Sequence, residues 1–514
     1  EALKETTPHM VAFGSYSWNT SLTLKTAEYL RDRERDLVIA LGGPDVSQLA
    51  DITKRDLEAN RQVDFCIADE GEVPMRHLVE AYMGSSSRSS LRDKAIPGCL
   101  SLESPTVSGI FAERISDINE IPSPYLSGLM DRFLRDSDYL PIVQTARGCP
   151  YQCTFCVSGK DSWRKVKEFE MDRVKAEVDY VADHAASAYL RLADENFGIL
   201  HRDLEIAEYI VEKRRRVGFP STVSIYTDKH PTERVMEINR VMKDVLPFNI
   251  SFQSVTRDVL HNIKRVNLRA REVQTAIAYA RDHDLMLVTE LIFGLPGETA
   301  ATFLESIDTL IDYRFESIGI NQLQILKGSE MDHESDRRKF RVETMFAMAQ
   351  NGYTQHEIEN IEIDELVVAN DSLSRDDYFR INKFIAFFMF AHHQGFLKEL
   401  LFLFENRGVR STAMITQALD DPVRCPIVYE FGERFATGFL RSLHDTRAEV
   451  TASARKRPLE APKSAPGIYK LYTDLVIDLL MNGQLDDVAE ELASTGKALY
   501  AEQSGSVPSD LEEE

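Results

Sequence analysis

Short apolar runs alternate with amphipathic stretches over residues 1–84. The apolar runs at 9–16, 37–41 and 63–67 have the length of strands and are followed by glycine, proline, serine or acidic residues. Residues Ser21–Arg33 between two of these runs carry helical periodicity. Strand–helix–strand order predicts a parallel sheet with helices on its faces. Three strands are few for such a Rossmann-like α/β domain, so we expect it to be partial, without an opening strand–helix unit.

A second alternation begins after a connecting segment. Residues 85–139 contain the polar run Ser85–Ser90 and four prolines, which is typical of a linker. Residues 140–330 contain six strand candidates with helical patterns between them. These strands are expected at 142–146, 189–193, 222–226, 249–255, 286–293 and 317–325. Six β/α units are too few for an eight-unit barrel of about 250 residues, so the pattern predicts an open, partial (β/α)6 barrel.

The alternation ends in residues 331–514, which predict a mostly helical C-terminal region. The pattern over 340–445 is helical. Residues 451–466 are rich in Ala, Pro, Lys and Arg and are expected to form a linker. The chain ends in an acidic tail at 509–514, which we expect to be solvated.

Composition narrows the range of partners. The 514 residues include 60 Lys and Arg against 83 Asp and Glu, a formal net charge of −23. An acidic protein is a poor match for a phosphate backbone, so we expect no nucleic-acid partner. The longest apolar run, Ile385–Ala391, is far shorter than the roughly 20 residues of a membrane span, so we expect no membrane partner. Without a secretory signal pattern, a cytoplasmic location with reduced cysteines is expected.

Three of the six cysteines crowd into one loop. Cys149, Cys153 and Cys156 lie in TARGCPYQCTFCVSGK, directly after the first strand candidate of the second alternation. Three such thiolates can converge on one metal centre. Structural zinc sites take four ligands from two separated pairs, and no second pair follows here. Three cysteines holding an iron–sulfur cluster instead leave one iron open to another ligand. Three buried or zinc-binding thiols are the structural alternative.

The C-x3-C-x2-C spacing, with Phe155 before the last cysteine, resembles the signature of the radical S-adenosylmethionine (SAM) superfamily. The resemblance implies that Cys149, Cys153 and Cys156 hold a [4Fe–4S] cluster whose open iron chelates SAM. One electron from that cluster would cleave SAM to methionine and a 5′-deoxyadenosyl radical, which abstracts hydrogen from an unactivated carbon. An external flavodoxin or ferredoxin would supply the electron.

The same resemblance implies further SAM contacts. Asp194, Glu195 and Asn196 end the second strand candidate and match the segment that receives the SAM amino group, although a helix cap is an alternative. Gly294 and Gly297 match a turn near the adenine, although a plain strand-to-helix turn is an alternative. Ligands lie at strand ends on one rim of a β/α barrel. Candidate ribose and carboxylate contacts at such ends are Ser224, Tyr226, Gln253 and Ser254. Arg265 and Lys327 are candidates for carboxylates or for surface ion pairs.

The first domain resembles the cobalamin (B12)-binding domain that precedes the barrel in one radical SAM subgroup. The matching pieces are Phe13–Asn19, Leu41–Pro44 and Asp69–Glu72. The cobalamin contacts that this implies are Ser17, Trp18, Asn19, Gly42, Gly43, Pro44, Glu70, Gly71 and Glu72. No D-x-H-x-x-G segment, whose His ligates cobalt in some of these domains, is present. A flavodoxin-like fold without a cofactor is the alternative.

Together these features predict a cobalamin-dependent radical SAM enzyme. We expect it to C-methylate an unactivated carbon of a small-molecule or peptide substrate, such as a natural product or a cofactor precursor. Two alternatives stay open: radical oxidation, rearrangement or cyclisation without net methyl transfer, and an inactive metal-binding scaffold. A transfer-RNA methylthiotransferase is disfavoured, because its extra N-terminal cysteine triad is absent: only Cys66 and Cys99 precede the cluster loop.

Overall fold

The fold is described from a computed structural model. Its described residues are 7–47, 50–103, 114–265, 268–349, 360–455 and 468–506. The predicted tail at 509–514 and residues 456–466 of the predicted linker lie outside these ranges. Residues 451–455 of that linker instead complete a helix.

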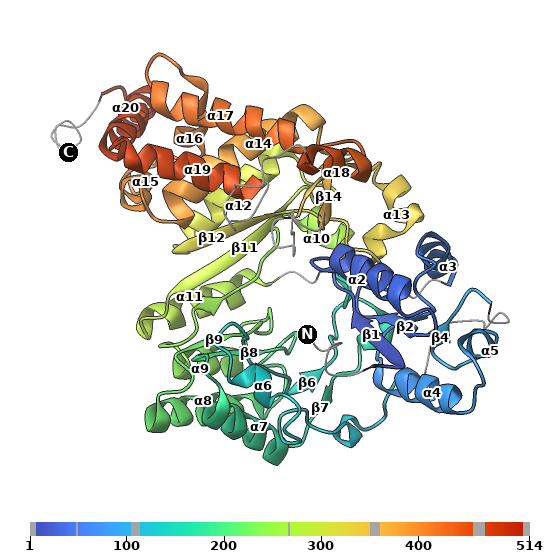
Figure 1. The fold of residues 1–514 in the computed structure, drawn as a ribbon. Helices are drawn as coiled ribbons and strands as arrows, with labels where there is room; N and C mark the ends of the chain where they lie inside the picture. Colours follow the sequence, from blue (N-terminus) through green and yellow to red (C-terminus); the bar gives the residue numbers. More distant parts are fainter. Residues whose placement is uncertain are drawn as a thin grey trace.

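A four-stranded sheet forms the first part of the chain (Figure 1). Its strands, in spatial order, are β1 (Met10–Gly14), β2 (Val38–Gly42), β3 (Phe65–Ile67) and β4 (Cys99–Leu100). The first three are parallel, as predicted, whereas β4 pairs antiparallel with β3. Because β4 lies in the predicted connecting segment 85–139, the sheet continues past residue 84.

Helices cover both faces of this sheet. They are α2 (Thr20–Arg33), α3 (Ala50–Ala59), α4 (Glu72–Met83) and α5 (Arg88–Arg92). Leu30 of α2 and Leu57 of α3 share one buried cluster, and Leu78 of α4 and Leu91 of α5 share another. The two clusters make a three-layer α/β unit, since alternate side chains of the strands point to opposite faces.

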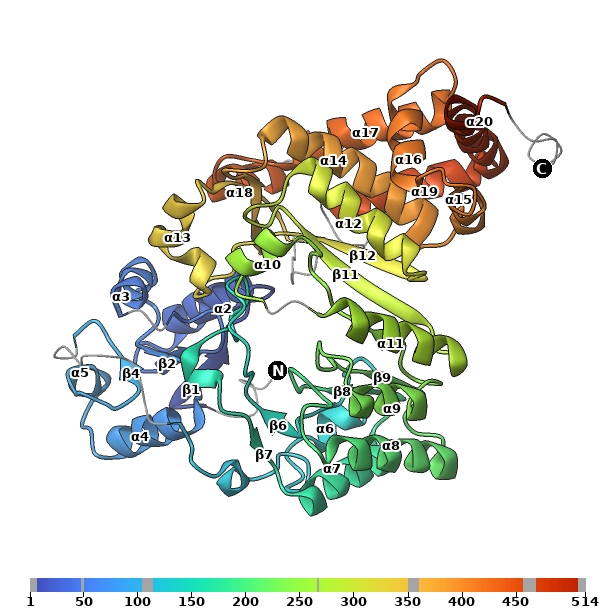
Figure 2. The ribbon, with the colours of Figure 1, turned by 180° about the vertical axis from the view of Figure 1, so that it is seen from behind.

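The central part forms two parallel three-stranded sheets, which confirms the six predicted strands (Figure 2). One sheet contains β5 (Ile142–Val143), β8 (Tyr189–Leu192) and β9 (Thr222–Ser224), and the other contains β10 (Phe248–Asn249), β11 (Leu287–Phe293) and β12 (Ser317–Gln322). A parallel bridge between Phe197 and Thr227 continues the first sheet beyond its strand ends. The helices of this part are α6 (Asp131–Leu134), α7 (Met171–His184), α8 (Asp203–Val217), α9 (Glu233–Val241), α10 (Arg257–Asn262), α11 (Ala270–Asp282) and α12 (Ala300–Asp312).

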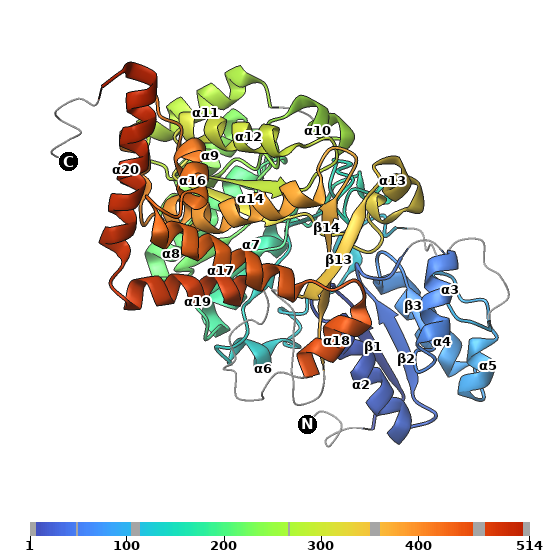
Figure 3. The same ribbon diagram turned by 90° about the horizontal axis from the view of Figure 1, so that it is seen from above.

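The C-terminal region is mostly helical but includes a β-hairpin that the sequence analysis missed (Figure 3). The hairpin pairs β13 (Glu343–Met348) with β14 (Ile363–Ala369). Ile325 donates its N–H to the carbonyl of Glu365 at 2.9 Å, so β14 continues the barrel beyond β12. The helices are α13 (Glu334–Lys339), α14 (Arg375–Phe388), α15 (Lys398–Glu405), α16 (Ser411–Asp420), α17 (Pro426–Ser442), α18 (Arg447–Arg455), α19 (Ile468–Met481) and α20 (Leu485–Ser504). No helix within the described ranges is long and apolar enough to cross a bilayer.

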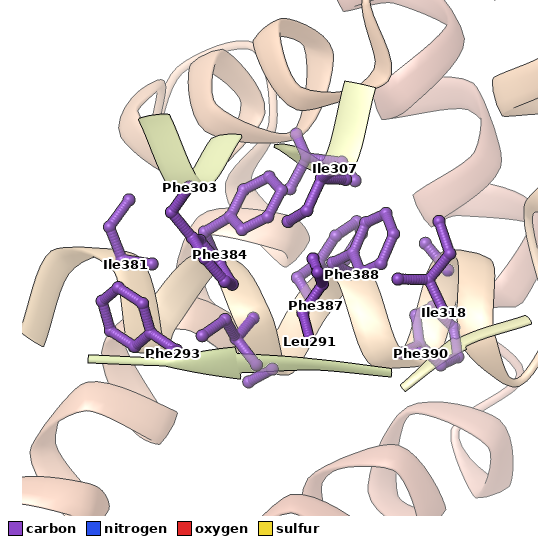
Figure 4. Packing of buried hydrophobic residues seen from close by; sticks show 14 of the residues in the cluster. Leu291, Phe293, Phe303, Ile307, Ile318, Ile381, Phe384, Phe387, Phe388 and Phe390 are labelled. Atoms are coloured by element: carbon purple, nitrogen blue, oxygen red, sulfur yellow. The ribbon is translucent and has the colours of Figure 1, made fainter. Parts of the chain in front are cut away.

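The barrel and the helical region share one aromatic core (Figure 4). Phe293 of β11 lies 4.6 Å from Phe303 of α12 and 5.6 Å from Tyr378 of α14, measured between ring centroids. Leu291, Phe384 and Phe387 are buried in the same cluster. Such packing is as dense as an organic crystal, so the C-terminal helices are fixed on β11 and β12 rather than tethered to them.

A buried carboxylate stabilises the first sheet. The side chain of Asp64 is fully buried, lies 2.7 Å from Arg31 and 2.6 Å from Arg88, and accepts the N–H of Ile39 at 2.9 Å. Asp64→Ala leaves two guanidinium groups without their counter-ion, which destabilises a folded protein by about 3–5 kcal/mol. We expect the first domain of this variant to unfold at a lower urea concentration. The fluorescence of Trp18, recorded in a Trp163→Phe background, measures this unfolding midpoint. The exposed Asp36→Ala is the control, and equal midpoints for the two variants would contradict this role of Asp64.

Candidate functional site

The cysteine loop is closed by the antiparallel pair β6 (Ala146–Arg147) and β7 (Lys167–Glu168). Cys149 donates its N–H to the carbonyl of Trp163 at 2.9 Å inside this closure. A Cβ atom on Gly159 would clash with the Cys153 carbonyl oxygen, so only glycine allows this close approach. The loop therefore folds back on itself around Cys153.

Distant parts of the barrel hold the middle of the loop. Thr154 donates its N–H to the carbonyl of Ile263 at 3.2 Å and accepts the N–H of Met331 at 3.0 Å. Phe155, the predicted aromatic position, packs against a buried cluster that includes Leu295 and Leu323. These contacts join the first strand of the barrel to segments that follow its fourth and sixth strands.

All three thiols of the loop are free, with Cys153 buried and Cys149 and Cys156 half-buried. Burial raises the pKa of Cys149, and it raises the pKa of Cys156 to about 11, with the neighbouring thiols as smaller causes. A bound metal centre would supply the positive charge that deprotonates such thiols.

Among the residues that the structure describes, no three His, Cys, Asp or Glu side chains lie close enough to hold a single metal ion. That finding concerns one ion. In an iron–sulfur cluster, the cysteines bind separate iron atoms and lie farther apart. Three free thiols on one anchored loop suit that group, and their ligand role stays a prediction.

The three predicted residues after β8 have different environments. Asp194 is buried, accepts the N–H of Thr145 at 2.7 Å and also accepts the Thr145 hydroxyl, so it ties the end of β8 to the end of β5. Glu195 accepts the hydroxyl of Ser158, and its second oxygen is buried with no hydrogen-bond partner in the described part of the chain. Asn196 donates to the sulfur of Cys149 at 3.1 Å. Only the last two face the cysteine loop.

The segment after β11 forms the strand-to-helix turn that the alternative interpretation described. Gly297 donates its N–H to Ser372 at 2.9 Å, and the Asn370 side chain donates to the carbonyl of Gly294 at 3.0 Å. Predicted SAM contact Ser254 is buried and donates to Glu298 at 3.2 Å. These contacts fasten the turn to the end of the hairpin, and a role at the SAM adenine stays a prediction.

Among the other predicted strand-end residues, Ser224 and Tyr226 both contact Arg191, whereas Gln253 follows a different strand. Gln253 adopts φ +67°, a left-handed conformation that is rare outside glycine and is enriched at functional sites. Ser224 accepts the Arg191 side chain at 3.0 Å. Tyr226 lines a cavity of about 550 Å³ together with Phe155.

Sequence reasoning missed a buried cation beside the loop. Lys229 is 5% exposed, and its ammonium lies 3.6 Å from the ring centroid of Tyr151, within the cysteine loop. Its nitrogen has no hydrogen-bond partner among the described residues, and burial lowers the pKa of Lys229 to about 8. The Tyr151 hydroxyl donates to Asp228 at 2.5 Å. A buried cation without a hydrogen-bond partner among the described residues is a candidate receptor for an anion. The position of Lys229 just after β9 was the available signal.

The two basic residues that the sequence singled out differ. Arg265 places one nitrogen 3.9 Å from the sulfur of Cys153 and donates another to the carbonyl of Ser251, so it lies at the cysteine loop. Lys327 pairs with Asp56 of the first domain at 2.6 Å, which confirms the ion-pair interpretation for that residue.

A cavity of about 640 Å³ lies between the first domain and the cysteine loop. Its lining includes the predicted residues Gly43, Pro44, Glu70, Gly71 and Glu72 from the first domain, and Ser158, Lys160, Trp163 and Glu195 from the barrel. Gly43 has φ +101°, and a Cβ atom there would lie 2.6 Å from the Ser15 carbonyl oxygen. The glycine turn after β2 therefore packs directly against the end of β1 at the wall of this cavity.

The remaining predicted cobalamin residues have structural contacts. Trp18 stacks on Tyr16 with ring centroids 4.5 Å apart. Asn19 donates to the carbonyl of Gly14 at 3.1 Å, and the carbonyl of Gly42 accepts the N–H of Ser15 at 2.6 Å. Ser17 lines a different cavity.

Two residues that line the cavity are also engaged in ion pairs. Glu70 is buried and lies 3.2 Å from Arg114, and it accepts the N–H of Ile115 at 3.0 Å. Glu72 pairs with Arg147 at 2.9 Å. These contacts join the first domain to the barrel across the cavity wall.

Comparison with known proteins agrees with the site. Residues 143–310 match the radical SAM superfamily. The chain is 30% identical over 423 residues to the cobalamin-dependent radical SAM methyltransferase TokK of Streptomyces tokunonensis. It is 28% identical over 424 residues to the 2-(S-pantetheinyl)-carbapenam-3-carboxylate methyltransferase of Streptantibioticus cattleyicolor. Each match covers 79% of this chain but 60% of the relative, so the chain spans three fifths of their length.

A solved structure also overlaps the chain. The radical SAM methyltransferase TsrM from Kitasatospora setae, with cobalamin and a [4Fe–4S] cluster bound, matches at a TM-score of 0.49 and 17% identity. The match covers 64% of this chain and 67% of TsrM.

The β/α domain with a three-cysteine loop after its first strand is therefore a radical SAM domain. The chain's similarity to TokK, which covers 79% of the chain, confirms the resemblance to the cobalamin-binding subgroup.

Glu298 makes the stability of the barrel depend on pH. Burial raises the pKa of Glu298 from 4.5 to about 8, so the folded protein keeps a proton that the unfolded chain releases. This contribution is fully present below about pH 4.5 and is lost as the pH rises towards 8. We expect Glu298→Gln, which stays neutral, to become progressively more stable than the wild type between these two pH values in urea unfolding. Glu305→Gln, at an exposed position of α12, is the control, and a pH-independent difference for Glu298→Gln would contradict this explanation.

Proposed function

We propose that this protein is a cobalamin-dependent radical SAM methyltransferase that acts on a carbon of a small-molecule or peptide substrate. The observation that carries the proposal is the cavity shared by the glycine turn of the first domain and the cysteine loop. That cavity gives a large cofactor direct access to the place where SAM would bind. The names of the relatives TokK and the carbapenam methyltransferase support methyl transfer as the reaction class.

Cys149, Cys153 and Cys156 would hold a [4Fe–4S] cluster, which, when bound, supplies the electron that cleaves SAM. The Asn196 amide donates to the sulfur of Cys149, and the Arg265 guanidinium lies beside the sulfur of Cys153. Hydrogen bonds and cations at the sulfurs stabilise the reduced state of such a centre.

Two buried charged groups near the loop match the two ends of an amino acid. Glu195 has a free carboxylate oxygen to receive an ammonium group, and Lys229 has a free ammonium to receive a carboxylate. We assign these residues to the methionine part of SAM. Each buried charge then gains the partner that its desolvation requires.

The first-domain cavity suits a cofactor that approaches backbone closely. Gly71 begins α4, and the position of its missing Cβ has no atom within 4 Å. Gly43 has no side chain, so the turn after β2 packs directly against the backbone of Ser15. Gly43 and Gly71 would hold cobalamin, which, when bound, supplies a methyl carrier for the reaction.

Anaerobic reconstitution with iron and sulfide, followed by reduction with dithionite and addition of methyl-labelled SAM with and without cobalamin, tests the proposal. We expect 5′-deoxyadenosine in both samples and label on cobalamin in the sample that contains it. If 5′-deoxyadenosine forms but no label leaves SAM for cobalamin, the protein uses its radical for oxidation, rearrangement or cyclisation instead. If neither appears, the chain is not an active radical SAM enzyme.

The two ends of α4 give a matched pair of variants for cobalamin. Gly71→Leu places a side chain in open space at the cavity, whereas Gly84→Leu adds the same side chain at the exposed end of the helix. We expect Gly71→Leu to weaken cobalamin binding at least about tenfold, a loss of about 1.4 kcal/mol, because the leucine occupies cofactor space. Equilibrium dialysis measures this. Equal cobalamin binding by both variants would show that cobalamin does not bind in this cavity.

Lys229→Met tests the anion receptor. We expect the dissociation constant for SAM to rise about tenfold or more, because the carboxylate loses a buried partner. Lys264→Met is the control, since Lys264 is half-exposed and pairs with Glu330 on the surface. Iron content should be unchanged in both variants. An unchanged SAM affinity in Lys229→Met would show that another group receives the carboxylate.

A further inference from the structure

The cavity of about 550 Å³ connects the cysteine loop to the C-terminal region. Phe155 of the loop and Tyr226 after β9 line it at one side. The remaining walls come from β11 and β12, from the hairpin, and from α14, α17 and α19. The C-terminal region therefore supplies most of a chamber that begins at the radical SAM site.

Most side chains that line this chamber are apolar, among them Ile320, Leu366 and Met389. None of its described lining residues is Lys, Arg or His. The one ionisable carboxylate, Asp364, accepts the Gln324 side chain at 3.2 Å. An anionic group placed here would lose its hydration without gaining a counter-ion, which is strongly unfavourable. The chamber thus selects against a carboxylate or phosphate at the reacting end of a substrate.

One polar group in the chamber lacks a partner. The side-chain oxygen of Gln322, at the end of β12, is buried and accepts no hydrogen bond from any described residue. A buried acceptor left without a donor costs free energy that a ligand can recover by supplying an N–H or O–H group. The amide therefore specifies a hydrogen-bond donor on the ligand.

The chamber adjoins a larger cavity of about 1170 Å³ between the first domain and the hairpin. Gln324, Leu326 and Asp364 line both spaces. The larger cavity carries side chains of both charges, including Arg55 and Glu334. An elongated ligand can place its apolar end in the chamber and its polar end in the larger cavity.

We propose that the chamber binds the reacting end of the substrate, and that this end is uncharged, mainly apolar and carries an N–H or O–H donor for Gln322. A polar remainder of the substrate extends past Gln324 and Asp364. This assignment rests on the proposed function, because it takes the chamber beside Phe155 as the place of reaction.

Three small probes of one shape test the chemistry of the chamber. They are 5-dimethylaminonaphthalene-1-sulfonamide, its N,N-dimethyl derivative and the corresponding sulfonate. Equilibrium dialysis against the reconstituted full chain measures their binding. We expect the sulfonamide to bind at least about tenfold more tightly than the anionic sulfonate, with the derivative that lacks N–H groups in between. Equal affinity of sulfonamide and sulfonate would overturn the proposal.

Two variants locate the binding. Gln322→Leu should remove the preference for the sulfonamide over its dimethyl derivative. Asn321→Lys adds a cation at an exposed lining position and should raise sulfonate affinity at least about tenfold. Arg380→Trp, at an exposed position of α14 outside the chamber lining, should leave all three affinities unchanged. If neither lining variant changes the order of affinities, the probes bind elsewhere and the proposal fails.

A parallel assay of methyl transfer separates this inference from the proposed function. Label transfer from SAM to cobalamin together with equal affinity for sulfonamide and sulfonate would overturn the substrate assignment alone. If the probe affinities are as expected but SAM is not cleaved, the binding preference of the chamber stands. The chamber is then not assigned to a reacting substrate.

Discussion

The anchoring of the cysteine loop is the constraint on which the rest of the site depends. Thr154 forms backbone hydrogen bonds to Ile263 and Met331, from segments more than a hundred residues away, while Gly159 lets the loop fold onto Cys153. Backbone groups buried inside a protein must find partners, so these bonds fix the loop whatever its side chains bind. This one segment carries the three thiols. The Glu195 carboxylate and the Lys229 ammonium both contact it.

The loop also separates two spaces of different chemistry. On the side of the first domain, glycine turns and ion pairs surround a cavity whose lining includes charged side chains of both signs. On the side of the C-terminal region, apolar side chains surround a chamber without a described cation. The aromatic core that joins β11 to α12 and α14 holds the second space rigid, because close-packed rings leave little room for movement.

The local sequence pattern predicted the features that depend on residues close together in the chain. Apolar runs marked the strands of the first sheet and of the barrel, and spacing singled out Cys149, Cys153 and Cys156. Pairings between distant segments were beyond that reasoning. The strand β4 has only two residues, too few to form a pattern, and the hairpin β13–β14 lies in a stretch whose pattern indicated helix. Asp194 and Ser254 stood at strand ends as expected. Their side chains, however, form hydrogen bonds with Thr145 and Glu298, which are distant in the sequence. Lys229 belongs to no motif, and apart from its position just after β9 only its burial over Tyr151 reveals it.

The most direct test of the central claim is electron paramagnetic resonance of the reduced, anaerobically reconstituted protein, recorded before and after addition of SAM and combined with iron and sulfide analysis. We expect a [4Fe–4S] signal that changes when SAM binds to the open iron. When Cys149, Cys153 and Cys156 are all replaced by alanine, we expect both the signal and the iron to be lost. Unchanged iron content in that triple variant, or a signal that SAM does not alter, would contradict the account.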